Sequence, residues 1–170
     1  YLVYQQLQNA AAATESVEKG ITATQWAGRF ERVSTNPTVV IDGAHNTSAV
    51  DQIVKLLQTD FSSGHITILM GILADKQADK MVEKMDTIPN ATVYLTQFSG
   101  PGKRSAADPK KLEHQLETVG DQALIIDDWH EAISTLAGQL APEDMLLITG
   151  SLYFISDVRQ YLKDNPRIFK

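Results

Sequence analysis

From Thr38 onward, short apolar runs alternate with amphipathic helical patterns, and this alternation is the feature that most constrains the fold. The runs predict strands over residues 38–41, 65–71, 91–96, 123–126 and 144–149. Strands that alternate with helices of about 10–15 residues indicate βαβ units and a parallel sheet. Because the runs are apolar throughout, helices should cover both faces of the sheet. The sequence therefore predicts an α/β fold with three layers, in which helices flank a mostly parallel sheet.

The helices are predicted from apolar residues that recur at helical spacing. Such stripes lie over residues 50–57, 78–85, 112–119, 129–136 and 152–162. Asp108 and Pro109 predict the start of the third helix, since aspartate caps helices and proline suits the first helical position. Nearer the N-terminus, residues 1–14 are alanine-rich and predict a helix, whereas residues 22–37 show no period and predict an irregular linker.

Composition narrows the class of protein. The 170 residues suffice for one domain with a sizeable core, and no apolar run approaches the roughly 20 residues that a membrane span needs. Without cysteine, disulfides and thiolate metal sites are excluded, and we expect a cytoplasmic protein. The net charge of −6 argues against generic nucleic-acid binding. An anionic ligand would therefore need a local basic site.

Three strand exits share one pattern, in which an apolar strand is followed by a glycine, a polar capping residue and a helix. The exits read VVIDGAHNTS (39–48), TILMGILADK (67–76) and LLITGSLY (146–153). In a parallel sheet all three lie on the carboxyl edge, where ligands of open α/β sheets bind. Each following helix begins with unpaired N–H groups and a partial positive charge. The pattern predicts a binding edge that prefers a negatively charged ligand.

The polar residues of these exits are the candidate site residues, namely Asp42, His45, Asn46, Asp75, Lys76, Ser151 and Tyr153. Each also has a purely structural interpretation, as a turn residue, a helix cap or a helix-face residue. Their clustering on one edge is what favours a functional role. Lys103 and Arg104 follow the 91–96 strand in a glycine-rich loop, and there we favour a solvated loop over a ligand contact.

Several motifs are absent. The sequence has no G-x-x-x-x-G-K-[ST] phosphate-binding loop and no G-x-G-x-x-G after its first strand. Its four histidines have no spacing that suggests a metal site, and no Ser-His-Asp arrangement is apparent. No metal ligand and no catalytic residue is therefore assigned to this chain.

Four segments in order resemble the C-terminal domain of folylpolyglutamate synthase/dihydrofolate synthase, within the Mur ligase superfamily. They are TQWAGRFERV, VVIDGAHNTSAV, ILMGILADK and TGSLYFISDVR, which match the family pattern W-P-G-R-[FL]-E, D-G-A-H-N-P, G-x-x-x-D-K-D and G-S-L-Y. The match spans residues 26–154, and Ala27, Thr47 and Gln77 depart from it. The resemblance implies a Rossmann-like Mur ligase C-terminal domain over 26–170. Residues 1–25 would then be a helical remnant and linker from a preceding ATP-binding domain, with an unusually short interval before Trp26.

The resemblance implies a reaction that uses ATP with Mg²⁺. A carboxylate is phosphorylated to an acyl phosphate, and the amine of L-glutamate then attacks it. The acceptor would be a folate or dihydropteroate. The partner would be the N-terminal P-loop domain, which carries the Mg²⁺ ligands in that family, and family members are usually monomers. This chain alone would be inactive.

The resemblance also implies roles for single residues. Arg29 would contact the ATP phosphates, which suits a guanidinium fork. Asp42 would bind the nucleotide at its ribose hydroxyls, and His45 would also contact ATP. The residues expected to bind glutamate or to line the cleft are Asn46, Asp75, Lys76, Ser151 and Tyr153.

Two other functions are compatible with the sequence. One is the C-terminal domain of a Mur peptidoglycan ligase, which shares the fold, although G-S-L-Y fits the folate branch better. The other is a stand-alone α/β nucleotide-binding module without catalysis. A P-loop domain ahead of Tyr1 would distinguish the ligases from the module.

Overall fold

The computed structural model describes residues 27–61, 64–102, 104–113 and 124–169, and these contain a six-stranded sheet. The strands are β1 (Glu31–Thr35), β2 (Thr38–Asp42), β3 (Ile66–Met70), β4 (Ala91–Gln97), β5 (Ile125–Asp128) and β6 (Met145–Thr149). Their order in the sheet is β1-β2-β6-β3-β4-β5. All neighbours are parallel except β1, which is antiparallel to β2. The mostly parallel sheet predicted from the sequence is confirmed.

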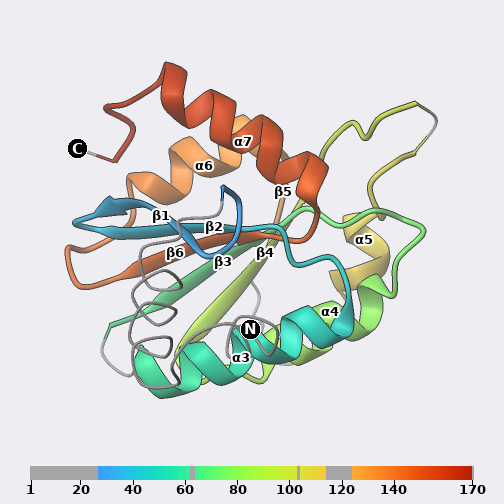
Figure 1. Cartoon of the computed structure of the whole chain (residues 1–170), viewed down its shortest axis with the longest axis horizontal. Coiled ribbons are helices and arrows are strands. Elements are labelled where there is room, and N and C mark those ends of the chain that lie inside the picture. Colours follow the sequence, from blue (N-terminus) through green and yellow to red (C-terminus); the bar gives the residue numbers. More distant parts are fainter. Residues whose placement is uncertain (1–26, 62–63, 103, 114–123, 170) are drawn as a thin grey trace, which may run out of the picture.

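Helices cover both faces of the sheet and complete three layers (Figure 1). They are α3 (Thr47–Asp60), α4 (Ala78–Asp86), α5 (Pro109–Leu112), α6 (Trp129–Ala137) and α7 (Leu152–Asp164). The helices α3 and α4 lie on one face, and α6 and α7 lie on the other. None of the helices in the described part of the chain is long and apolar enough to cross a membrane.

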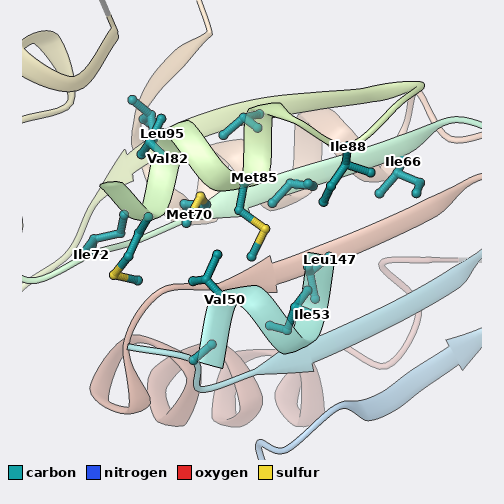
Figure 2. Packing of buried hydrophobic residues seen from close by; sticks show 14 of the residues in the cluster. Val50, Ile53, Ile66, Met70, Ile72, Val82, Met85, Ile88, Leu95 and Leu147 are labelled. Carbon is teal, nitrogen blue, oxygen red and sulfur yellow. The ribbon is translucent and has the colours of Figure 1, made fainter. Parts of the chain in front are cut away.

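Each face of the sheet has its own hydrophobic core. Every residue of β3 and β6 is buried, because these central strands are covered on both sides. Figure 2 shows side chains of α3, such as Val50, and of α4, such as Met85, gathered against strand residues such as Leu147. On the opposite face, Phe154 of α7 is fully buried in the second core. The continuous apolar runs of the sequence therefore reflect two-sided burial.

Two of the predicted helix starts are confirmed in detail. The side chain of Asn46 caps α3 by accepting a hydrogen bond from the Ala49 N–H at 2.9 Å, and Asp108 caps α5 with Pro109 at its first turn. The structural interpretation of Asp75 was that it caps α4, and this interpretation is wrong. The cap position of that helix is Gln77, two residues later, and it makes no side-chain capping hydrogen bond.

Other boundaries differ from the prediction. Part of the segment predicted as an irregular linker forms β1, an edge strand whose residues are half-buried or exposed and so carry no apolar run. The last strand before α6 spans residues 125–128 instead of 123–126, and α6 begins at Trp129. The helix predicted over 112–119 is described only to its first turns, and the segments predicted over 1–14 and 1–25 lie outside the described residues.

The turn from β6 into α7 depends on Gly150. Its φ is +117°, and a Cβ atom built there would lie 2.5 Å from the carbonyl oxygen of Gly71. We expect Gly150→Ala to lower the free energy of unfolding by about 2 kcal/mol or more, because backbone strain and a clash with backbone atoms combine. Urea unfolding would measure this difference.

Gly138→Ala is the matched control for that substitution. Gly138 has an ordinary φ of −73°, and its added Cβ would meet nothing closer than 3.5 Å. This variant should gain about 0.4–1 kcal/mol of stability through a less flexible unfolded chain. Equal stabilities of the two variants would show that the Gly150 turn can adapt to a side chain.

Asp144 fastens the turn before β6 to the start of β3. Its carboxylate accepts hydrogen bonds from the His65 N–H at 2.9 Å and the Ala141 N–H at 2.8 Å. Both bonds lower the pKa of Asp144, and the bond from His65 has the larger effect. Because the folded-state pKa is lowered, the stabilisation is present above the unfolded-state pKa and is lost as pH falls through the folded-state value.

We therefore expect Asp144→Ala to lower the free energy of unfolding at pH 7 by about 1 kcal/mol, discounted because the group is partly exposed. The difference in the free energy of unfolding between Asp144→Ala and the original chain should become smaller as pH falls below about 4. Glu143→Ala removes a neighbouring exposed carboxylate and should leave stability nearly unchanged. A pH-independent loss in Asp144→Ala would contradict the role of its ionised form.

Candidate functional site

The register of the sheet places the last residues of β2, β6 and β3 directly beside one another. Asp42 at the end of β2 pairs with Thr149 at the end of β6, and Thr149 pairs with Met70 at the end of β3. The Gly71 N–H then donates to the Thr149 carbonyl oxygen at 2.9 Å. Residues that follow these strands therefore start from neighbouring points on the carboxyl edge, as the sequence predicted.

Asp42 is a turn residue that also holds the segment of Arg29. The side chain is only 8% exposed, and its oxygens accept the Ala44 N–H and the Phe30 N–H, each at 2.7 Å. The Gly43 N–H adds a bond to the Gly28 carbonyl oxygen at 2.8 Å. The exposed Arg29 thus sits between two residues that are fastened to the end of β2.

The tautomer of His45 follows from its contact with the same turn. Its Nδ1 lies 2.8 Å from the Gly43 carbonyl oxygen. A carbonyl oxygen only accepts, so Nδ1 donates, and the neutral ring keeps Nε2 as an acceptor. The half-buried imidazole is therefore oriented by the backbone that it follows.

A cavity of about 310 Å³ lies along this edge, within the size range of small-molecule pockets. Its lining residues are His45, Leu73, Lys76, Arg104, Ser151, Leu152 and Tyr153. Four of them are predicted site residues, so the structure brings together the exits of β2, β3 and β6. Asn46 is exposed and its side chain is used in the cap of α3, and Asp42 is not among the lining residues.

The lining of the cavity suits an anion. Lys76 and Arg104 contribute cationic groups, and none of the described lining residues is acidic. Ser151 starts α7 and is 1% exposed, yet its Oγ has no hydrogen-bond partner among the described residues. A buried hydroxyl without a partner is costly, and a polar ligand would satisfy it. The N-terminus of α7 adds favourable N–H groups.

Arg104, for which the sequence favours a solvated loop, lies in the loop between β4 and α5 and is among the residues that line the cavity. Its Nη2 donates to Asp75 Oδ2 at 2.6 Å, and its guanidinium carbon lies 5.6 Å from the ring centroid of Tyr153. The signal that could have found it was a basic residue shortly after a strand that ends on the same edge. Lys103 lies outside the described residues.

No metal centre is evident in the described residues, which contain no group of three or more His, Cys, Asp or Glu placed to hold an ion. The chemistry visible on this edge is therefore binding chemistry: cationic groups, a lone hydroxyl, an oriented imidazole and an exposed arginine on a fastened segment. This arrangement can hold and orient an anionic ligand.

Comparisons with known proteins identify the family and the fold of the chain. Residues 28–152 match the family described as "Mur ligase, glutamate ligase domain". The chain is 34% identical to folylpolyglutamate synthase of Lacticaseibacillus casei, over 87% of this chain and 32% of that protein. It is 29% identical to dihydrofolate synthase/folylpolyglutamate synthase of Bacillus subtilis, over 91% of this chain and 34% of that protein. The chain spans about a third of the length of these curated relatives.

Solved structures share the fold. The structure "E.coli FolC in complex with ADP, without folate substrate" superimposes with a TM-score of 0.76 at 22% identity, over 92% of this chain and 38% of that chain. A bifunctional folylpolyglutamate synthase/dihydrofolate synthase "with Mn, AMPPNP and L-Glutamate bound" gives a TM-score of 0.73 at 23% identity, over 91% and 39% of the two chains. The sequence match covers well over half of the 170 residues, and the chain belongs to the family of Mur ligase, glutamate ligase domains.

Proposed function

We propose that this chain is the C-terminal part of an ATP-dependent ligase that adds L-glutamate to folates or dihydropteroate. The observation that carries the proposal is the cationic cavity on the carboxyl edge, beside an arginine segment that Asp42 fastens to β2. The names of the relatives supply the substrate class, because they are folylpolyglutamate and dihydrofolate synthases.

In the proposed reaction, the γ-phosphoryl group of ATP moves to an oxygen of the acceptor carboxylate, and ADP leaves. The amine of L-glutamate, having lost its ammonium proton, then attacks the acyl carbon. Inorganic phosphate leaves with the C–O electron pair and takes up the proton that the attacking nitrogen loses, and an amide remains. Such chemistry depends mainly on positioning and on stabilising negative charge.

Under the proposal, this work is divided between two parts of the enzyme. It contains no P-loop motif, so we place the phosphate-cradling loop on an N-terminal domain, together with the Mg²⁺ ligands. Mg²⁺, when bound there, would neutralise phosphate oxygens. The residues described here supply cationic and polar contacts from the opposite side.

Arg29 is the proposed phosphate contact. It is exposed, and its guanidinium offers a fork of donors to phosphate oxygens. Its segment is held by the hydrogen bond that the Phe30 N–H donates to Asp42 and by the one that the Gly43 N–H donates to the Gly28 carbonyl oxygen. Asp42 therefore serves the nucleotide end by positioning Arg29. Each of its oxygens keeps a second lone-pair site for a ribose hydroxyl, although the small exposed area limits access.

His45 and Ser151 are the proposed contacts of the incoming amino acid. His45 and Ser151 line the same cavity; Nδ1 of His45 is engaged by the Gly43 carbonyl oxygen, and the buried Oγ of Ser151 has no partner among the described residues. Lys76 adds positive charge to the cavity, and Tyr153 supports Arg104. Asn46 acts through the cap of α3, which follows His45 directly.

The proposal is tested by ATP-dependent incorporation of labelled L-glutamate into tetrahydrofolate and dihydropteroate, with this chain joined to its P-loop domain. We expect Arg29→Ala and Asp42→Ala each to lower kcat/KM for ATP by roughly 10- to 100-fold, the effect of losing a charge-assisted contact. Arg32→Ala, which removes a neighbouring exposed cation from β1, is the matched control and should remain active. Absence of ligation with both acceptors would refute the proposed function.

A double variant separates the two roles considered for Asp42. If Asp42 acts by positioning Arg29, the combined variant should lose little more than Arg29→Ala alone, because the two residues act as one unit. A loss equal to the product of the single losses would instead assign Asp42 an independent contact, such as the ribose hydroxyls. Circular dichroism of each variant would check that the fold is retained.

A further inference from the structure

We infer that Arg159 of α7 is a positioning residue, which holds Arg29 in the direction that phosphate binding needs by clamping the carboxylate of Glu31. This inference rests on the proposed function and deepens it, because it adds a residue to the nucleotide end of the site. Arg159 is not among the described residues that line the cavity on the carboxyl edge, and the sequence motifs assign it no role.

The turn that carries Arg29 is strained on both sides of that residue. Gly28 has a φ of +70°, and Phe30, which is not a glycine, has a φ of +43°. A left-handed backbone is unusual for phenylalanine and persists only where the surrounding contacts impose it. Arg29 itself is exposed. The direction of its side chain therefore depends on the contacts that hold its two neighbours.

Both neighbours of Arg29 are held by hydrogen bonds. Phe30 is held from the β2 side, because its N–H donates to Asp42. Gly28 is held through both of its backbone polar groups. Its carbonyl oxygen accepts the Gly43 N–H at 2.8 Å, and its own N–H donates to Glu31 Oε2 at 2.7 Å. The carboxylate of Glu31, the first residue of β1, therefore closes the turn around Arg29.

Arg159 fixes the carboxylate that closes this turn. Its Nε donates to both oxygens of Glu31, each at 2.9 Å, and the two side chains are only 35% and 21% exposed. Ile155, one helical turn earlier, packs beneath the same turn, since a Cβ atom built on Gly28 would lie 3.2 Å from Ile155 Cγ2. Residues four apart share one face of a helix, so α7 presents an apolar side chain and a cation to the turn together.

Loss of the Arg159 guanidinium should therefore act on nucleotide binding through a chain of contacts. The Glu31 carboxylate would be free to rotate toward water, and the Gly28 N–H would lose its acceptor. The strained turn could then relax, and Arg29 would take several directions instead of one. A side chain that must be ordered on binding contributes less affinity than one that is already oriented.

The test measures kcat/KM for ATP in the complete ligase, with this chain joined to its P-loop domain. Arg159→Met should lower kcat/KM for ATP by roughly 3- to 10-fold, a smaller loss than in Arg29→Ala because the Arg29 guanidinium is still present. KM for L-glutamate should not change. Arg159→Lys should keep most of the activity, because an ammonium group still donates to the Glu31 carboxylate.

A double variant distinguishes positioning from a general effect on the fold. If Arg159 acts through Arg29, then Arg159→Met should cost nothing further in kcat/KM for ATP once Arg29→Ala is present. An equal loss in both backgrounds would overturn the inference. Lys163→Met is the matched control, because it removes an exposed positive charge one turn further along α7, and it should remain fully active.

Unchanged kcat/KM for ATP in Arg159→Met would overturn the inference while leaving the proposed function intact. Calorimetric titration with a non-hydrolysable ATP analogue provides a readout that needs no turnover. Analogue binding that depends on Arg159 only while Arg29 is present, in a protein that ligates nothing, would support the positioning role and refute the proposed function. A protein that neither ligates nor binds the analogue would refute both.

Discussion

The level register of β2, β6 and β3 is the constraint on which the rest of the site depends. Asp42, Thr149 and Met70 end their strands side by side, so the three turns that follow must share a small space. Gly150 permits this crowding, because the backbone of Gly71 occupies the volume that a side chain would need. The two cores, one on each face of the sheet, fix the register of the strands. The register in turn fixes the positions of the residues at the carboxyl edge.

Asp42 also positions a segment that lies outside the parallel part of the sheet. A nearly buried carboxylate is stable only when its oxygens are satisfied, and here two backbone N–H groups satisfy them. One of these groups belongs to the same turn, and the other belongs to the chain before β1. The segment that carries Arg29 is thereby attached to the sheet through a side chain, in addition to the antiparallel pairing of β1.

Much of this could be predicted from the sequence, because burial on both faces leaves a strong signal. The central strands are apolar throughout, and their exits carry the glycines and polar residues that locate the edge. The edge strand β1 left no such signal, since its residues are at most half-buried. The position of Arg104 beside the β3 and β6 exits could not be predicted, because strand order, which brings β4 beside β3, cannot be deduced from local patterns.

Asp75 shows why a local rule can misplace a residue. Aspartate before a helix favours a capping role, yet here an ion pair with Arg104, 29 residues away in the sequence, engages the side chain instead. Exposed ion pairs contribute little stability, so the pair is better explained by orientation of the guanidinium. Leu152 and Tyr153 line the cavity, and their side chains are exposed on this edge of the sheet. Under the proposed function, this edge forms one side of a cleft, and the domain that brings ATP closes it.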